Sequence, residues 1–161
     1  MSRRHVLTFL AWALFACGVI ATAVRTAKDY QTPGPFDPSA QGLCDFHNGI
    51  YFPTRALLDG VSPYGNEYAA TNPVARQIPF FSPGILVLHS PFAVMPLRLA
   101  EIMFFCFSVV LLIAIARLSA RIAIDSGGES ADGPSLGLWT AGLATLLVFS
   151  RGGHITLFNG Y

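Results

Sequence analysis

Three apolar runs, separated by polar segments, set the pattern of this chain. They cover residues 6–24, 97–116 and 136–150. A helix rises about 1.5 Å per residue, so about 20 residues span the roughly 30 Å hydrocarbon core of a bilayer. The third run is somewhat short and needs its flanking residues to reach that length. The pattern predicts an all-α, polytopic membrane protein with about three transmembrane helices.

The first run is compatible with either a membrane anchor or a cleaved signal peptide. Residues 21–23 read Ala-Thr-Ala, which resembles a cleavage site. The run is long for a signal peptide, however, and further apolar runs follow it, so we favour the anchor. Arg3 and Arg4 precede the run, and the positive-inside rule therefore places the N-terminus in the cytoplasm.

A fourth apolar stretch, residues 80–95, is short and contains two prolines. If it crossed the membrane, Arg117 and Arg121, which follow the 97–116 run, would lie outside. The positive-inside rule disfavours that arrangement. We therefore interpret residues 80–95 as a juxtamembrane or half-inserted helix on the outer side.

The predicted topology follows from these assignments. Residues 25–96 form a large outer loop with juxtamembrane helices, residues 117–135 form a cytoplasmic linker, and residues 151–161 begin a second outer segment. The polar segments around Asp45 and around His154 are thus expected to meet on the same face of the membrane.

The outer loop contains a short amphipathic pattern. Five of its residues fall on one helical face: Ile50, Tyr51, Thr54, Leu57 and Leu58. Pro53 indicates that the helix either starts there or kinks, and Gly60 is a plausible end. Such a helix could lie flat on the bilayer with its apolar side down.

The composition supports a membrane protein and excludes several other classes. Hydrophobic residues make up 53% of the 161 positions and charged residues only 12%, about half of the roughly 25% typical of soluble domains. The net charge of +1 argues against nucleic acid as a partner. Three cysteines form no disulfide framework, and no zinc-ligand spacing or glycine-rich phosphate loop is evident.

Two carboxylates are candidates for chemistry. Asp45, at the outer interface, is either a general base or an ordinary cap of the following helix, since aspartate is a favoured N-cap. Glu101 is the lone carboxylate of the second span, and an intramembrane acid is a functional candidate by default. It lies only about one turn from the outer boundary, so it could instead simply reach the interface.

The segment that follows the third run offers cations and the outer loop offers aromatic rings. Arg151 and His154 could bind a phosphate, because arginine presents a planar fork of donors and histidine adds a titratable one. Alternatively, both side chains extend from the end of the span to the interface. Tyr51 and Tyr64 suit the membrane interface, where the ring is apolar and the hydroxyl is wet.

The order of these features resembles one family of enzymes. The stretches "DFHNGIYFPTRALLDGVSPYG", "PFFSPGILVLHSPFAVMPLRLAEIMFF" and "SRGGHITLFNG" follow a first span. Together they resemble the N-terminal part of the GT-C membrane glycosyltransferases, in particular glycosyltransferase family 87. The resemblance covers nearly the whole chain, through loose motifs of an Asp, a Tyr six residues later, Ala-Leu-Leu-x-Gly and Pro-Tyr.

The resemblance implies an inverting hexosyltransferase, similar to the bacterial mannosyltransferases, in the plasma membrane. Its donor would be a polyprenyl-phosphate sugar and its acceptor a hydroxyl of a glycan or glycolipid, with the active site on the outer face. Asp45 matches the family's catalytic base, and Arg151 with His154 would stabilise the departing phosphate. Tyr51 and Tyr64 are further substrate-binding candidates. A divalent metal is neither indicated nor excluded.

The chain also departs from that family. Pro53 lies where relatives continue a helix, Gly160-Tyr161 replaces a frequent Gly-Gln, and relatives have many more spans. Three helices cannot enclose a prenyl phosphate and an acceptor. We therefore expect the N-terminal portion of a larger enzyme, inactive alone. The alternative is a small, non-catalytic, three-span membrane protein that acts as an assembly or partner subunit.

Overall fold

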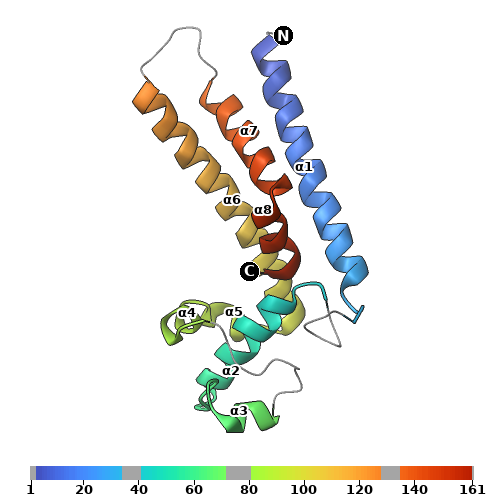
Figure 1. Cartoon of the computed structure of the whole chain (residues 1–161), viewed down its shortest axis with the longest axis vertical. Coiled ribbons are helices and arrows are strands. Elements are labelled where there is room, and N and C mark those ends of the chain that lie inside the picture. The colour runs from blue at the N-terminus through green and yellow to red at the C-terminus, as the bar shows by residue number, and fades with distance from the viewer. Residues whose placement is uncertain (1–2, 34–40, 72–80, 128–134, 161) are drawn as a thin grey trace.

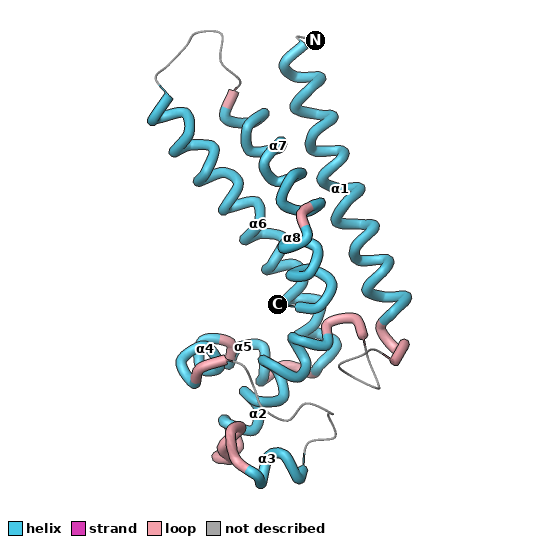
Figure 2. The backbone as a smooth tube through the Cα atoms, in the orientation of Figure 1, coloured by secondary structure: helices cyan, strands magenta, loops and turns pink. Residues whose placement is uncertain are grey.

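The computed structural model describes residues 3–33, 41–71, 81–127 and 135–160, and over these ranges it contains helices and turns but no strand (Figure 2). Three long helices form the body of the molecule: α1 (Arg3–Asp29), α6 (Leu97–Gly127) and α7 (Leu136–Phe149). Helix α7 packs between α1 and α6 (Figure 1). The prediction of an all-α protein is thus confirmed.

Small and hydroxyl-bearing residues allow these helices to approach one another. Ala116 of α6 and Ala144 of α7 are completely buried in the same core cluster. A Cβ at Gly18 of α1 would lie 2.7 Å from a methyl carbon of Val148, so that position has room for glycine only. Thr145 donates a hydrogen bond of 2.9 Å across the helix pair to the carbonyl of Ala11. Such contacts are typical of helices that associate in a bilayer.

Two of the long helices, α1 and α6, are long and apolar enough to cross a membrane on their own. Helix α7 has 14 residues, about 21 Å, and is too short alone. It continues into α8 (Arg151–Ile155) and the π-helical turn η2 (Thr156–Gly160), which are bent away from it by 67°. The chain therefore has two candidate spans, or three if this bent pair counts as one.

The two ends of the bundle differ in character. The start of α1, the end of α6 and the start of α7 lie together at one end, and a layer of short helices lies at the other (Figure 1). That layer consists of η1 (Phe46–Tyr51), α2 (Phe52–Leu58), α3 (Asn66–Thr71), α4 (Pro83–Leu88) and α5 (Ser90–Ala93). We call these short helices the outer layer, after the outer loop that the sequence predicts, and the side of the membrane that they face stays a prediction.

Proline divides the short helices. Residues 81–95 of the fourth apolar stretch form α4 and α5, each with a proline in its first turn, and residue 80 lies outside the described residues. Helix α2 begins at Phe52 with Pro53 in its first turn, but it continues directly from the π-helical η1, since Tyr51 and Phe52 both have the right-handed helical conformation. Pro53 therefore marks the change from π-helix to α-helix within one helical segment. Gly60, at φ +79°, follows the end of α2.

The apolar side of α2 packs mainly on protein. Thr54 is buried and its hydroxyl donates to the carbonyl of Leu86 in α4 at 3.3 Å. Ile50 and Tyr51 are buried just before it, whereas Leu58 remains half exposed. The predicted amphipathic face therefore holds the layer of short helices together.

Candidate functional site

Glu101, one turn into α6 and only 4% exposed, is a buried carboxylate with several polar partners. Its Oε1 atom accepts a hydrogen bond from the Tyr30 hydroxyl and another, of 2.6 Å, from Nε2 of His47. Its Oε2 atom lies 3.6 Å from a guanidinium nitrogen of Arg98. A buried carboxylate without partners would cost several kcal/mol. Glu101 has three, which we call together with it the Glu101 cluster (Tyr30, His47, Arg98 and Glu101).

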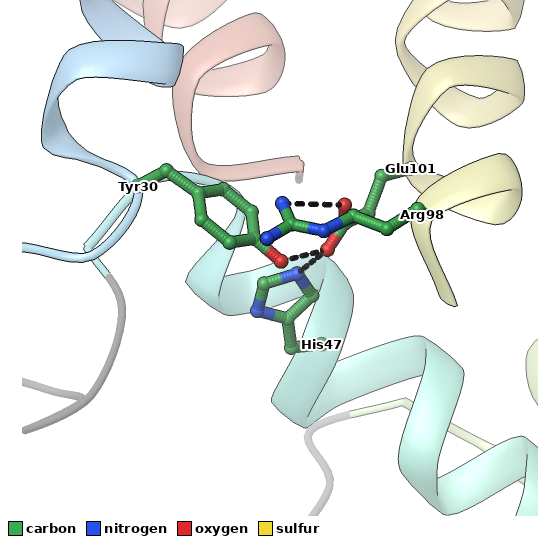
Figure 3. Close-up of polar contacts among 4 residues, drawn as sticks. All are labelled: Tyr30, His47, Arg98 and Glu101. Atoms are coloured by element: carbon green, nitrogen blue, oxygen red, sulfur yellow. Dashed lines mark hydrogen bonds and ion pairs between the residues drawn. The ribbon is translucent and has the colours of Figure 1, made fainter. Parts of the chain in front are cut away.

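The cluster joins three segments that are distant in sequence. Tyr30 directly follows α1, His47 lies in η1, and Arg98 and Glu101 lie three residues apart on α6. Figure 3 shows Tyr30 and His47 converging on one oxygen of Glu101, while the guanidinium of Arg98 lies across the Tyr30 ring. The carbon of that guanidinium is 4.1 Å from the ring centroid, a cation–π distance. The carboxylate thus ties the end of α1 and the outer layer to the start of α6.

Tyr30 keeps its proton in this environment. Burial raises the pKa of the Tyr30 hydroxyl well above its ordinary value, and the hydrogen bond to Glu101 and the charge of that carboxylate raise it further. The positive charge of Arg98 opposes them in part. Tyr30 therefore remains a hydrogen-bond donor to Glu101 over the whole physiological pH range.

A cavity of about 460 Å³ lies beside the cluster, between the last turns of α1 and the first turns of α6. Polar side chains line one end of it, contributed by Lys28, Tyr30, Gln31, Arg98 and Glu101. Apolar side chains and a thiol line the part that lies deeper along the helices, contributed by Ala23, Ile102, Phe105 and Cys106. The cavity is therefore amphipathic, and its polar end coincides with the outer layer.

Asp45, the predicted base, lies directly before η1 and is half-buried. Its backbone is already helical (φ −74°, ψ −34°), and its side chain makes no capping hydrogen bond. The cap interpretation of Asp45 is therefore not supported. One of its carboxylate oxygens lies 3.8 Å from the Cys44 sulfur.

The segment that carries Asp45 contacts the segment at the end of α7, as the sequence predicts. The N–H of Leu43 donates to the carbonyl of Phe158 in η2 at 2.8 Å. Gly160, at φ +74°, packs so closely on Phe46 that a Cβ there would lie 2.5 Å from the Phe46 Cβ. Leu43 itself has φ +58°, a left-handed conformation that costs a non-glycine residue about 1–3 kcal/mol. A strained residue thus lies two positions before Asp45, at the contact between the two segments.

The arginine that contacts His154 in the described residues is Arg25 of α1. Its Nη1 atom donates to Nε2 of His154 at 3.0 Å, and its guanidinium carbon lies 4.7 Å from the Phe158 ring centroid. The rings of His154 and Phe158 are stacked with centroids 5.8 Å apart. Arg151, which we paired with His154 from the sequence, is exposed at the start of α8.

The two candidate tyrosines hold the outer layer together through their hydroxyls. Tyr51 is buried and donates to the carbonyl of Met95 at 2.8 Å. Tyr64 is exposed and donates to the carbonyl of Phe81 at 2.6 Å. Neither residue lines the cavity beside Glu101.

The sequence singled out Glu101 but not its partners. Tyr30, His47 and Lys28 lie in polar stretches where nothing in the spacing distinguishes them. The usable signal was the pair of Arg98 and Glu101, three residues apart at the start of a span, because such charges at a membrane boundary usually have partners. Over the described ranges, no group of three histidine, cysteine, aspartate or glutamate side chains could hold a metal ion.

Comparisons with known proteins found no relative. No family model matches this chain, and no curated protein and no solved structure is significantly similar to it. The chain stands as a small helical protein with two or three candidate membrane spans, which indicate an integral membrane protein.

Proposed function

We propose that this chain is part of an inverting glycosyltransferase of the GT-C type, similar to family 87, in the bacterial plasma membrane. The enzyme would move a sugar, mannose or a related hexose, from a polyprenyl-phosphate donor to a hydroxyl of a glycan or glycolipid on the outer face. The observation that best supports this is the contact between the Asp45 segment and the His154 segment, joined by the hydrogen bond from Leu43 to Phe158.

The chemistry requires one base and cationic stabilisation of the leaving group. Asp45 would take the proton of the acceptor hydroxyl as its oxygen attacks the anomeric carbon of the donor. The bond from that carbon to the phosphate oxygen breaks, and its electron pair leaves with the polyprenyl phosphate. A phosphate is a good leaving group and needs no general acid, unlike the leaving group of a glycoside hydrolase. Arg25 and His154, at the same end of the bundle, are cationic and titratable groups for the departing charge.

The described helices leave such a site open. A substrate site normally encloses most of its ligand, and this needs more walls than three long helices supply. The proposal therefore concerns the protein or assembly in which these residues are found, with further elements completing the site.

The test measures sugar transfer in membrane vesicles from cells that produce the native gene product. Tritiated mannosyl polyprenyl phosphate is the donor, and label incorporated into membrane glycans and glycolipids is the readout. Asp45→Asn should reduce the transfer rate about 100-fold or more, because general-base catalysis contributes about 10²–10⁴-fold.

The matched control is Asp59→Asn, an equally conservative change at an exposed position just after α2. It should leave the rate nearly unchanged, and both variants should insert at wild-type levels. Near-normal transfer by the Asp45 variant would refute its assignment as the base. Wild-type vesicles that transfer no sugar would favour the alternative of a non-catalytic subunit.

A further inference from the structure

We propose that the cavity between α1 and α6 binds the anionic phosphodiester head group of a membrane lipid, with Lys28 and Arg98 as its cationic ligands. The inference deepens the proposed function, and it rests on that function only for the identity of the lipid. Binding itself is measured without any transfer of sugar.

The cavity has the polarity of such a lipid along its length. Helices α1 and α6 run in opposite directions, so Lys28 near the end of α1 and Arg98 near the start of α6 lie at the same end (Figure 1). Eight residues separate Arg98 from Cys106, which places the deeper wall about 12 Å along the helix. A head group at the polar end would therefore direct its hydrocarbon chain along apolar side chains such as Phe105.

The charge of the lining suits one negative charge. Lys28 and Arg98 contribute two positive charges and Glu101 one negative charge, for a net charge of +1 among the lining residues. A phosphodiester carries a charge of about −1. One oxygen of Glu101 already accepts two hydrogen bonds, from Tyr30 and His47. Arg98 lies 3.6 Å from the other oxygen of Glu101 while its side chain remains 66% exposed, so it can contact the carboxylate and a ligand at the same time.

Arg98 is arranged to receive such a ligand. Its guanidinium lies on the Tyr30 ring and beside Glu101, yet the side chain remains 66% exposed. Stacking on the ring uses the face of the guanidinium and leaves N–H donors on its edge for an oxyanion. A planar fork of this kind binds phosphate oxygens in pairs. The Glu101 cluster thus positions an arginine whose donor edge remains accessible.

The size of the cavity fits a head group and the first part of a chain. Its volume of about 460 Å³ lies within the usual range of small-molecule sites, about 300–1,000 Å³. Leu43 lines the same cavity two residues before Asp45. A lipid phosphate bound there would lie at the end of the bundle that carries the proposed base.

The experiment measures lipid binding by native mass spectrometry of the purified, detergent-solubilised protein. Three probes are titrated separately: polyprenyl-phosphate mannose, phosphatidylglycerol, and unphosphorylated polyprenol of the same chain length. The first two carry an anionic phosphodiester and should form 1:1 complexes, whereas the neutral alcohol should bind at least about tenfold more weakly. A preference for polyprenyl-phosphate mannose identifies the lipid as the donor, and equal binding of phosphatidylglycerol identifies a general anionic lipid.

Lys28→Gln tests the site without altering the Glu101 cluster, and Arg98→Gln removes the second cation. Each should weaken binding of the anionic probes about tenfold, since a charge-assisted hydrogen bond contributes about that factor. Arg121→Gln, an exposed arginine at the other end of α6, removes the same charge and should change nothing. Unaltered affinity in both cavity variants, or equal binding of polyprenol, would overturn the inference.

Location is checked with a phosphatidylglycerol analogue that carries a photoreactive diazirine on the first carbons of its acyl chain. It should label the peptides that contain Ala23 and Phe105, and labelling confined to other peptides would overturn the assignment. Binding without sugar transfer by wild-type membranes would count against the proposed function alone. Sugar transfer by wild-type membranes, together with unaltered lipid affinity in the Lys28 and Arg98 variants, would count against this inference alone.

Discussion

At the scale of single residues, the stability of the outer layer depends on one carboxylate. Glu101 joins Tyr30, His47 and Arg98, and both its own side chain and that of His47 are buried. Hydrogen bonds in which one partner is charged contribute more to stability than neutral ones, about 1.5–3 kcal/mol each. The polar end of the cavity therefore depends on this side chain for its shape.

Glu101→Gln keeps the size of the side chain and removes its charge. It should lower the free energy of unfolding by about 1–3 kcal/mol, because the amide accepts weaker hydrogen bonds from Tyr30 and His47. Thermal unfolding of the detergent-solubilised protein measures the change. Asp59→Asn, the same loss of charge at an exposed position just after α2, is the control and should shift the free energy by about 0.5 kcal/mol or less. Equal effects of the two changes would contradict the role of Glu101.

Tyr30 predicts a pH dependence of stability at high pH. Its pKa is raised in the folded protein above the ordinary 10.0, mainly by burial. Above about pH 10 the unfolded chain has lost this proton while the folded protein keeps it, so the folded state becomes less stable as pH rises. Tyr30→Phe should remove that part of the slope above about pH 10. Unfolding curves with parallel pH dependence in both proteins would contradict the prediction.

At the scale of elements, the apolar runs and the prolines predicted the helices, whereas the spacing of individual side chains predicted little. The apolar runs correspond to the three long helices, and Pro53 lies in the first turn of α2, where the π-helical η1 gives way to an α-helix. The bend between α7 and α8 has only a weak local signal, a serine directly before the second helix, which the hydrophobic pattern does not show. It depends on Ser150, whose hydroxyl donates to the Leu147 carbonyl and accepts from the Gly153 N–H. Those two hydrogen bonds form only in the folded bend, and the hydrophobic periodicity of the sequence does not predict them.

The two adjacent glycines at the bend differ in the room that each leaves for a side chain. A Cβ at Gly153 would overlap the carbonyl oxygen of Leu147, whereas a Cβ at Gly152 would meet nothing closer than 4.0 Å. Gly153→Ala should therefore destabilise the protein by about 1–3 kcal/mol. Gly152→Ala should be neutral or slightly stabilising, because alanine favours the helix. Thermal unfolding of both variants measures the two changes in stability. Equal changes would contradict the close approach of Gly153 to the Leu147 carbonyl.

At the scale of the whole molecule, the sequence predicted which segments share an end of the bundle but not which side chains meet there. The positions of the positive charges and the lengths of the apolar runs were sufficient to predict which segments share an end, because both are properties of whole segments. Arg25 and His154 lie 129 residues apart, and their contact depends on how α7 and α8 return beside α1. The Glu101 cluster depends likewise on three segments packing at once. Contacts of this kind follow from the tertiary structure and have no local signature.

The arrangement of the ends predicts accessibility from the two sides of the membrane. In a variant without the three native cysteines, a single cysteine at Ser62 in the outer layer should react with an impermeant thiol reagent on intact cells. A cysteine at Ser126, near the end of α6, should react only after the cells are opened. Both positions are exposed in the folded chain. Labelling of both from outside would contradict the topology.

The contacts of Glu101 also depend on the order in which their residues are synthesised. Tyr30 precedes Glu101 by 71 residues and His47 precedes it by 54, so both are synthesised well before their common partner. These hydrogen bonds cannot form before Glu101 is synthesised at the start of α6, and the hydrogen bond from Leu43 to Phe158 must follow later still. The contacts of the outer layer are therefore completed in an order set by the positions of their later partners along the chain.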